Sequence, residues 1–184
     1  LDRSNTQVRD AAGFGGSFRF FTDNGDDAEI YGVESSGQFA LSRELILYGN
    51  LGLMSSDIDS FVLSNGTPAG GRELAYTPEY SYTVGLRYQG ESGLFGYTEL
   101  VGRDSYFESN SHDAERSSFT IVNASLGYAW DSWKITIWAR NLLDERYDNR
   151  VFFFGNDEDL GFAPARYESA ADPRQVGMTA SYLW

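Results

Sequence analysis

The feature that most constrains the fold is an alternation of apolar and polar residues with a period of two. The clearest case is the segment 119–130, where the apolar positions are Val122, Ala124, Leu126, Tyr128 and Trp130. Successive side chains of a β-strand point to opposite faces, so this alternation predicts strands with one apolar and one polar face. No segment of useful length has the 3.6-residue period of a helix. The sequence therefore predicts an all-β fold.

Turn-forming residues divide the alternating pattern into about eight strands. Seven complete strands are predicted, at about residues 17–41, 43–56, 79–89, 93–107, 118–130, 132–147 and 173–184. Residues 1–8 look like part of an eighth strand, and Asp23 to Asp27 indicate a loop within the upper part of 17–41. The connections alternate between short ones, near residues 42, 90–92 and 131–132, and long ones, at 57–78, 108–117 and 148–172. Up-and-down membrane barrels have this arrangement, with short turns at one end and long loops at the other.

Composition is consistent with strands that face lipid on one side. Aromatic residues make up 16% of the 184 residues and charged residues 22%. The aromatic residues gather near predicted strand ends, as in interfacial girdles. The longest apolar runs are too short for a transmembrane helix. The net charge of −13 excludes a nucleic-acid partner, and the absence of Cys excludes a disulfide scaffold and a thiolate metal site.

A soluble barrel or a β-sandwich would also alternate, and the sequence does not say which face points inward. The apolar face ends in aromatic residues, whereas the polar face carries cations, and this favours the membrane. We therefore expect an antiparallel up-and-down transmembrane β-barrel. Its predicted lumen-facing residues are Arg87, Lys134, Trp138 and Arg140. We expect the cations to pair with carboxylates such as Glu99.

Four segments resemble the C-terminal part of the barrel of TonB-dependent receptors. The first two are Ile30-Tyr31-Gly32-Val33-Glu34 and the stretch from Gly71-Arg72-Glu73-Leu74 to Thr77-Pro78-Glu79-Tyr80. The third is Arg140-Asn141-Leu142-Leu143-Asp144-Glu145-Arg146-Tyr147, which is similar to the family's Asn-Leu-x-Asp-x-x-Tyr signature. The fourth is Asp172-Pro173-Arg174-Gln175-Val176-Gly177, which opens a last strand ending on Trp184, where Phe is commoner. The last two carry the most weight because they occur together at the C-terminus.

The resemblance implies a receptor of the bacterial outer membrane with a 22-stranded barrel and a plugged lumen. Eight strands are about a third of that barrel, so residues 1–184 are interpreted as its C-terminal portion, without the plug domain and the N-terminal strands. The implied partners are the TonB–ExbB–ExbD energising complex, a small-molecule ligand, lipid and lipopolysaccharide, and the barrel assembly machinery. Tyr182 and Trp184 resemble the signal that this machinery reads.

The implied activity is energised uptake of a scarce nutrient, with a ferric siderophore as the default and a glycan, cobalamin or another chelate open. Two other hypotheses remain: a self-contained eight-stranded outer-membrane barrel with an adhesive or structural role, and a soluble carbohydrate-binding β protein. An enzyme is not expected, because His112 is the only His and no phosphate-binding loop is present. No cofactor is expected.

The long loops supply the candidate ligand contacts, which are Arg103, Tyr106, Phe107, Phe152, Phe153, Phe154 and Asn156. Exposed aromatic rings beside hydrogen-bonding groups suit sugars or aromatic siderophores. Packing of one loop against another is the simpler reading of the same residues. No metal site is predicted, because His112 with Asp113 and Glu115, and the run 157–159, are expected to be solvated loop charges. Asn141 and Asp144 are expected to cap a bend.

Overall fold

A computed structural model describes residues 2–3, 7–14, 17–24, 27–60, 62, 68, 71–110 and 114–184, with backbone only up to residue 24. No helix in this part of the chain is long and apolar enough to cross a membrane. The strands are β1 (Asp2–Arg3), β2 (Gln7–Phe14), β3 (Ser17–Asn24), β4 (Ala28–Ala40), β5 (Leu45–Ile58), β6 (Tyr80–Gln89), β7 (Leu94–Arg103), β8 (Tyr106–Phe107), β9 (Glu115–Arg116), β10 (Phe119–Trp130), β11 (Trp133–Arg140), β12 (Asp148–Phe154), β13 (Ala165–Ala170) and β14 (Gln175–Tyr182). The all-β prediction is confirmed.

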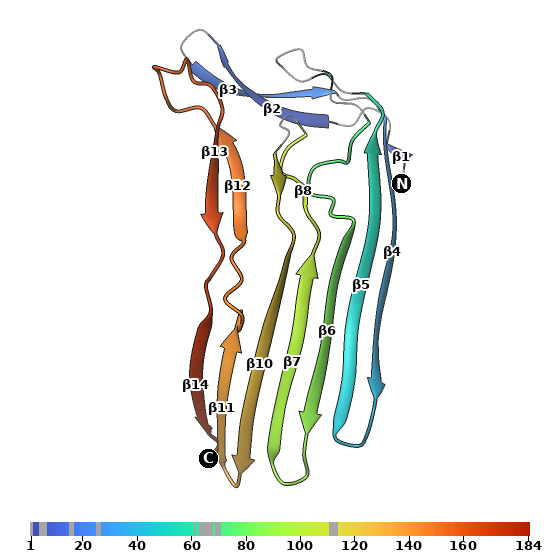
Figure 1. Ribbon diagram of the computed structural model, residues 1–184, viewed down its shortest axis with the longest axis vertical. Helices are drawn as coiled ribbons and strands as arrows, with labels where there is room; N and C mark the ends of the chain where they lie inside the picture. The colour runs from blue at the N-terminus through green and yellow to red at the C-terminus, as the bar shows by residue number, and fades with distance from the viewer. Residues whose placement is uncertain are drawn as a thin grey trace.

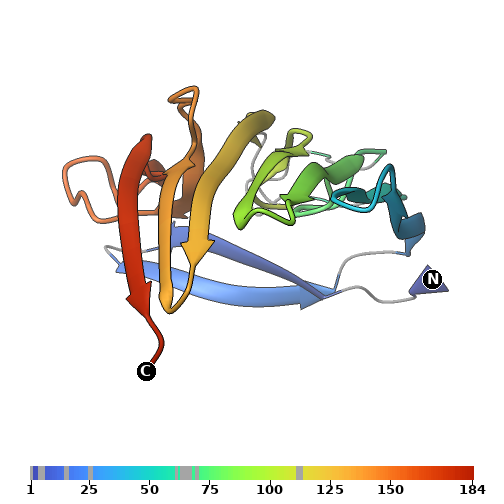
Figure 2. The ribbon, with the colours of Figure 1, turned by 90° about the horizontal axis from the view of Figure 1, so that it is seen from below.

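Eight of these strands form one antiparallel sheet in the order β1-β4-β5-β6-β7-β10-β11-β14. The expected count of eight strands is therefore confirmed. The turns β4–β5, β6–β7 and β10–β11 are short and lie at one end, and the long connections lie at the other (Figure 1). The sheet is curved but open (Figure 2), with β1 and β14 at opposite edges. The described strands therefore do not close into a small eight-stranded barrel.

The long connections contain three two-stranded hairpins, β2–β3, β8–β9 and β12–β13, which the sequence did not predict. Several strand limits were accordingly wrong. The predicted strand 17–41 is divided between β3 and β4, and 1–8 between β1 and β2. The strand 93–107 ends at Arg103, and its last residues belong to β8. The strand 132–147 ends at Arg140, because Asn141 adopts a left-handed conformation with φ of 48°.

The register assigns apolar side chains to one face of the sheet. Its large exposed side chains include Val33, Leu53, Val84, Leu100, Leu126, Ile137 and Met178. The only charged residues on this face in the main-sheet strands from β4 to β14 are Glu29 and Asp57. They are cross-strand neighbours near the end with the long connections. Aromatic residues border the face at both ends, as Tyr31 and Tyr80 do at one and Trp130 and Trp133 at the other. This charge-free band matches the lipid-facing surface of a membrane barrel.

The opposite, polar face is built with large rings lying over glycines of the neighbouring strand. Tyr48 lies over Gly85, Phe95 over Gly127 and Trp138 over Gly177, and each ring belongs to the residue paired with its glycine. A Cβ at any of these glycines would lie within 2.4 Å of a ring atom. Covering glycine with a cross-strand ring restores packing that glycine cannot supply itself.

A side-chain clasp ends β11 and begins β14. The Asn141 side chain donates from Nδ2 to the carbonyls of Glu145 (2.8 Å) and Asp172 (3.3 Å), and its Oδ1 accepts from the Glu145 amide (2.9 Å). Asp144 Oδ1 accepts from the Arg174 amide (2.9 Å). Asn141 is 3% exposed. The expected capping role of Asn141 and Asp144 is confirmed, and these bonds are called the Asn141 clasp below.

A charge placed on the apolar face should destabilise the receptor in lipid. Leu126→Arg puts a cation into the middle of that face, and the expected cost is about 2–4 kcal/mol in the free energy of unfolding. Unfolding of the full-length receptor in phospholipid vesicles by guanidinium measures this cost. Ser125→Arg is the matched control, since Ser125 precedes Leu126 on β10 and faces the polar side. Equal stability losses in the two variants would contradict the assignment of the faces.

The Asn141 clasp should stabilise the junction of β11 and β14. Asn141→Gly keeps the left-handed backbone accessible but removes three side-chain hydrogen bonds, so a loss of about 2–3 kcal/mol is expected. Denaturant unfolding of the full-length receptor in vesicles measures it. Leu143→Ala, in the same bend with Leu143 69% exposed, should change stability little. A neutral Asn141→Gly would show that the clasp contributes nothing.

Candidate functional site

The polar face carries the residues predicted to face the lumen. Arg87, Lys134, Trp138 and Arg140 all lie on it by register. The Arg87 guanidinium is 5.2 Å from the ring centre of Tyr48, the Lys134 ammonium 4.4 Å from that of Phe95, and the Arg140 guanidinium 5.5 Å from that of Trp138. Cation–π attraction therefore positions each cation on a ring.

Glu99 does not pair with these cations, contrary to expectation. Its carboxylate accepts a hydrogen bond from the Tyr48 hydroxyl (3.0 Å) and another from Asn123 Nδ2 (3.1 Å). In the part of the chain that the structure describes, Arg87, Lys134 and Arg140 make no ion pair. Each of the three cations lies on an aromatic ring instead.

The polar face consequently has a surplus of positive charge. Its charged residues on β4 to β14 are Arg87, Arg103, Lys134 and Arg140 against Glu34 and Glu99. The whole chain has a net charge of −13. The carboxylates are therefore concentrated outside this face, and the surface that would line a lumen is the cationic part of an acidic protein.

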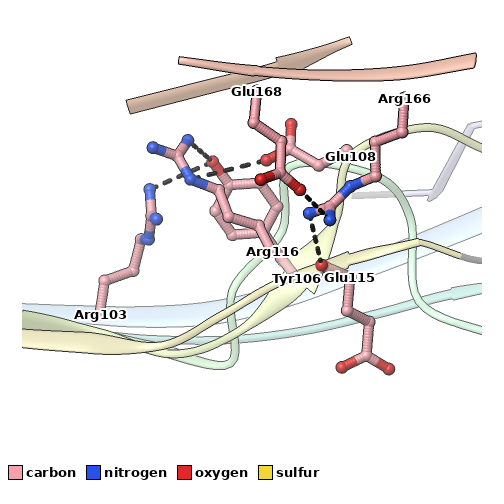
Figure 3. Close-up of polar contacts among 7 residues, drawn as sticks. All are labelled: Arg103, Tyr106, Glu108, Glu115, Arg116, Arg166 and Glu168. Atoms are coloured by element: carbon pink, nitrogen blue, oxygen red, sulfur yellow. Dashed lines mark hydrogen bonds and ion pairs between the residues drawn. The ribbon is translucent and has the colours of Figure 1, made fainter. Parts of the chain in front are cut away.

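Two arginines meet on one tyrosine above the end of β7 (Figure 3). Arg103 Nη1 donates to the Tyr106 hydroxyl (3.1 Å), and Arg116 Nη1 donates to the same oxygen (2.7 Å). The Arg103 guanidinium also lies 4.4 Å from the Tyr106 ring centre and 4.9 Å from that of Phe119. Tyr106 is 6% exposed. We call Arg103, Tyr106, Arg116 and Glu108 the arginine–tyrosine cluster.

Glu108 is the carboxylate of this cluster. Its Oε1 lies 3.5 Å from Arg116 Nε, an ion-pair distance without a hydrogen bond between the two atoms, and both side chains are almost fully buried. Arg103 Nε and Nη2 are also buried without a hydrogen-bond partner in the described residues. Burial raises the pKa of Glu108, and the charge of Arg116 opposes the rise. The cluster is thus a tightly packed unit with one more cation than anions.

Phe107, the third predicted residue of this group, is held by the connection between β5 and β6. The Arg72 guanidinium lies 4.4 Å from its ring centre, and Arg72 Nη2 donates to the Ser109 carbonyl (2.6 Å). The Tyr76 amide donates to the Phe107 carbonyl (2.9 Å). The packing interpretation therefore accounts for Phe107.

A cavity of about 600 Å³ lies beside this junction. Among the described residues, the carboxylates that line it are those of Asp57, Glu73, Glu79, Asp104 and Glu115, and the one cation is Arg72. Burial, followed by the charge of Glu79, raises the pKa of Glu73. Such a cavity would repel an anion. It therefore does not suit the kind of ligand that the cationic polar face would attract.

The second predicted group lies on the β12–β13 hairpin. Phe152 and Tyr167 stack with ring centres 5.4 Å apart, and the Arg150 guanidinium lies 5.3 Å from the Phe152 ring. The Tyr167 hydroxyl donates to Asn156 Oδ1 (2.6 Å). Phe152 and Phe154 are 43% and 37% exposed, whereas Phe153 is partly buried. The stacked rings of Phe152 and Tyr167 thus lie close to the Asn156 amide on this hairpin.

The arginine–tyrosine cluster and the aromatic residues of the β12–β13 hairpin are separate but adjacent. Arg166 of β13 forms an ion pair with Glu168, and its Nη2 donates to the Glu115 carbonyl at 3.5 Å (Figure 3). Sequence reasoning missed Glu108 and Arg116, which no motif marks. The available signal was weak: an acid and a base on either side of a short connection.

The metal sites considered from sequence gain no support. His112 and Asp113 lie outside the described residues. In the described part no three or more His, Cys, Asp or Glu residues are grouped as metal ligands. Asp157 instead caps a turn, since its Oδ1 accepts from the Asp159 amide (2.9 Å).

The two residues of the expected assembly signal differ in their surroundings. Tyr182 packs against Trp133 of β11, with ring centres 5.0 Å apart. Trp184 follows β14 and is fully exposed. Their role in assembly stays a prediction.

The raised pKa of Glu108 predicts the direction of a pH effect. A carboxyl group whose pKa is higher in the folded state makes folding more favourable as pH falls through that pKa, because the folded form then binds the proton more tightly. Between about pH 7.5 and the ordinary Glu pKa of 4.5, hydrogen exchange corrected for intrinsic rates should show more protection of β8–β9 at the lower pH. Glu108→Gln should remove most of that difference. Less protection at the lower pH in the unchanged receptor would contradict the argument.

Comparisons with known proteins agree with this architecture. The sequence profile of the family described as "TonB dependent receptor-like, beta-barrel" matches residues 1–142. Among solved structures, the ferric yersiniabactin uptake receptor FyuA from Yersinia pestis is 17% identical over 88% of this chain, with a TM-score of 0.70. The siderophore receptor PiuA from Acinetobacter baumannii is 15% identical over 97% of it, with a TM-score of 0.71.

A third structure, of the copper transporter OprC, is 14% identical over 98% of the chain, with a TM-score of 0.70. At these identities the structures support the fold alone. The chain spans only 24%, 24% and 28% of the lengths of FyuA, PiuA and OprC. The profile match covers most of the chain, and the chain therefore belongs to the TonB-dependent receptor-like β-barrel family, whose members are transporters of the bacterial outer membrane and not enzymes.

Proposed function

We propose that this chain is the C-terminal portion of the barrel of a receptor that takes up a metal chelate, by default a ferric siderophore, across the outer membrane. The receptor would draw energy from the TonB–ExbB–ExbD complex through a segment outside this chain. The barrel assembly machinery would recognise Tyr182 and Trp184, and lipid and lipopolysaccharide would surround the apolar face.

The observation that carries this proposal is the cationic polar face. Four cations and two carboxylates face that side, and none of the four cations is ion-paired within the described residues. Metal chelates built from carboxylate, catecholate or hydroxamate oxygens present negative charge or oxygen acceptors, which such a wall attracts. A neutral glycan gains less from unpaired cations.

The names of the similar structures point the same way. FyuA is described as a ferric yersiniabactin uptake receptor, PiuA as a siderophore receptor and FecA as a ferric citrate transporter. These descriptions belong to those proteins, and they set the first candidates to try with this one.

A glycan remains the second candidate because of the β12–β13 hairpin. The exposed Phe152 ring, stacked on Tyr167 between Arg150 and Asn156, is a surface on which a sugar ring can pack. Binding of a neutral oligosaccharide that is lost in Phe152→Ala and unaffected by loss of the polar-face cations would favour this candidate over the chelate.

Uptake by cells that lack the native receptor and carry the full-length protein tests the proposal. Iron-55 complexes of yersiniabactin, citrate and a catecholate form the first panel, with a copper complex beside them. For the transported complex, Arg103→Gln with Arg140→Gln should lower uptake by roughly tenfold or more, since a charge-assisted hydrogen bond contributes about 1.5–3 kcal/mol.

The matched control is Arg43→Gln, which removes a cation from the exposed β4–β5 turn. It should leave uptake unchanged, and outer-membrane levels of all variants should be equal. Uptake of none of the metal complexes, or equal loss in the control, would overturn the proposal.

A further inference from the structure

A shallow hollow of about 410 Å³ lies on the polar face between β4, β5 and β6. Its side chains come from Ser36, Gln38, Tyr48, Asn50, Thr83 and Arg87, and we call it the β4–β6 hollow. The paired glycines Gly37 and Gly49 contribute backbone to it. It is separate from the arginine–tyrosine cluster, and none of the residues predicted to contact ligand lines it.

The polar side chains of the hollow have unused hydrogen-bonding capacity. Within the described residues, the side chains of Ser36, Gln38, Asn50 and Thr83 make no hydrogen bond, and Arg87 makes no ion pair. Two amides, two hydroxyls and one guanidinium therefore face the same space with donors available. On the same wall, by contrast, Tyr48, Glu99 and Asn123 are bonded to one another.

Arg87 is held in a defined place at the edge of the hollow. Its guanidinium lies 5.2 Å from the ring centre of Tyr48. Tyr48 is itself held between Gly85, over which its ring lies, and Glu99, to which its hydroxyl donates. A cation positioned in this way needs little reorganisation to bind an oxyanion.

The donor set selects a class of ligand. No carboxylate is among the described residues that line the hollow. The Glu99 carboxylate beside Tyr48 already accepts hydrogen bonds from Tyr48 and Asn123, and Arg87 is the charged group that an anion in the hollow meets. A guanidinium fork binds either a carboxylate or a phosphate in bidentate geometry. Because Arg87 is the one cation among the described lining residues, it balances a singly charged carboxylate but not a doubly charged phosphate. The amides and hydroxyls supply donors for the remaining lone pairs.

We propose that the β4–β6 hollow is a carboxylate-binding subsite on the lumen wall. The inference rests on the proposed function only in taking the polar face as the lumen side. The carboxylate has two possible sources, the transported molecule or an acidic side chain from a part of the receptor outside this chain. Both present the same group to Arg87, and labelling of a thiol in the hollow distinguishes them.

Thr83→Cys places such a thiol in the hollow, and the chain has no other Cys. The experiment uses the full-length receptor in outer-membrane vesicles, any cysteines elsewhere having been replaced, and iodoacetamide as a neutral label. Tricarballylate is the probe, because it carries three carboxylates without the hydroxyl that makes citrate a chelator, and sucrose is the neutral control. Ser36→Cys provides a second thiol position on β4.

If the carboxylate belongs to the transported molecule, the hollow is empty when that molecule is absent. The thiol then reacts fast until the probe is added. For a Kd of about 1 mM, about 10 mM tricarballylate slows labelling roughly tenfold, while sucrose has no effect. An acidic side chain of the receptor itself gives slow labelling from the start, and Arg87→Gln speeds it. Either result supports the subsite and identifies the source.

Lys134→Gln is the matched control, since Lys134 also lies on the polar face against a ring but outside the hollow. It should leave the labelling rates unchanged. If Arg87→Gln changes neither the basal rate nor the effect of tricarballylate at both thiol positions, the subsite does not exist. Uptake of labelled iron complexes decides the proposed function separately, because transport can persist when the hollow binds nothing.

Discussion

The sheet depends on strict antiparallel register, because each strand has only two faces and they meet different surroundings. A slip of one residue in β6 would turn Arg87 toward the apolar side, and the same slip in β7 would turn Glu99 there. Charges at lipid depth cost several kcal/mol, so the membrane penalises such slips strongly. The backbone pairing of the strands also satisfies the amides and carbonyls that hydrocarbon cannot. The separation of an apolar face from a cationic face follows from register alone.

The rings over glycines explain how a polar wall can be ordered with few buried side chains. The described hydrophobic core is small, with Ala28, Ile58 and Leu74 at the end with the long connections. Along the rest of the sheet, cross-strand contacts take the place of a core. Tyr48, Phe95 and Trp138 each bind a cation and cover a glycine of the neighbouring strand.

The period of two allowed the main sheet to be predicted from sequence, including the faces of β10 and β11 and the short turns. The prediction failed in segments where apolar and polar residues do not alternate. The run Val151 to Phe154 is apolar throughout, so it gave no strand signal, although it forms most of β12. The arginine–tyrosine cluster could not be predicted, because the β8–β9 pairing brings Glu108 and Arg116 together only in three dimensions. The alternation predicted the lumen-facing cations and Trp138, but not that Tyr48 and Phe95 hold Arg87 and Lys134.

The Asn141 clasp makes the position of β14 independent of the long connection that precedes it. Its bond from Asn141 to the Asp172 carbonyl joins residues 31 positions apart, at the two ends of the connection that contains the β12–β13 hairpin. The entropic cost of closing a loop grows only slowly with its length. The clasp fixes both ends of this connection independently of the residues between them. Insertions or deletions in the hairpin would therefore leave the alignment of the last strand intact. The sequence and length of this connection can therefore change in evolution while the sheet that carries it keeps its geometry.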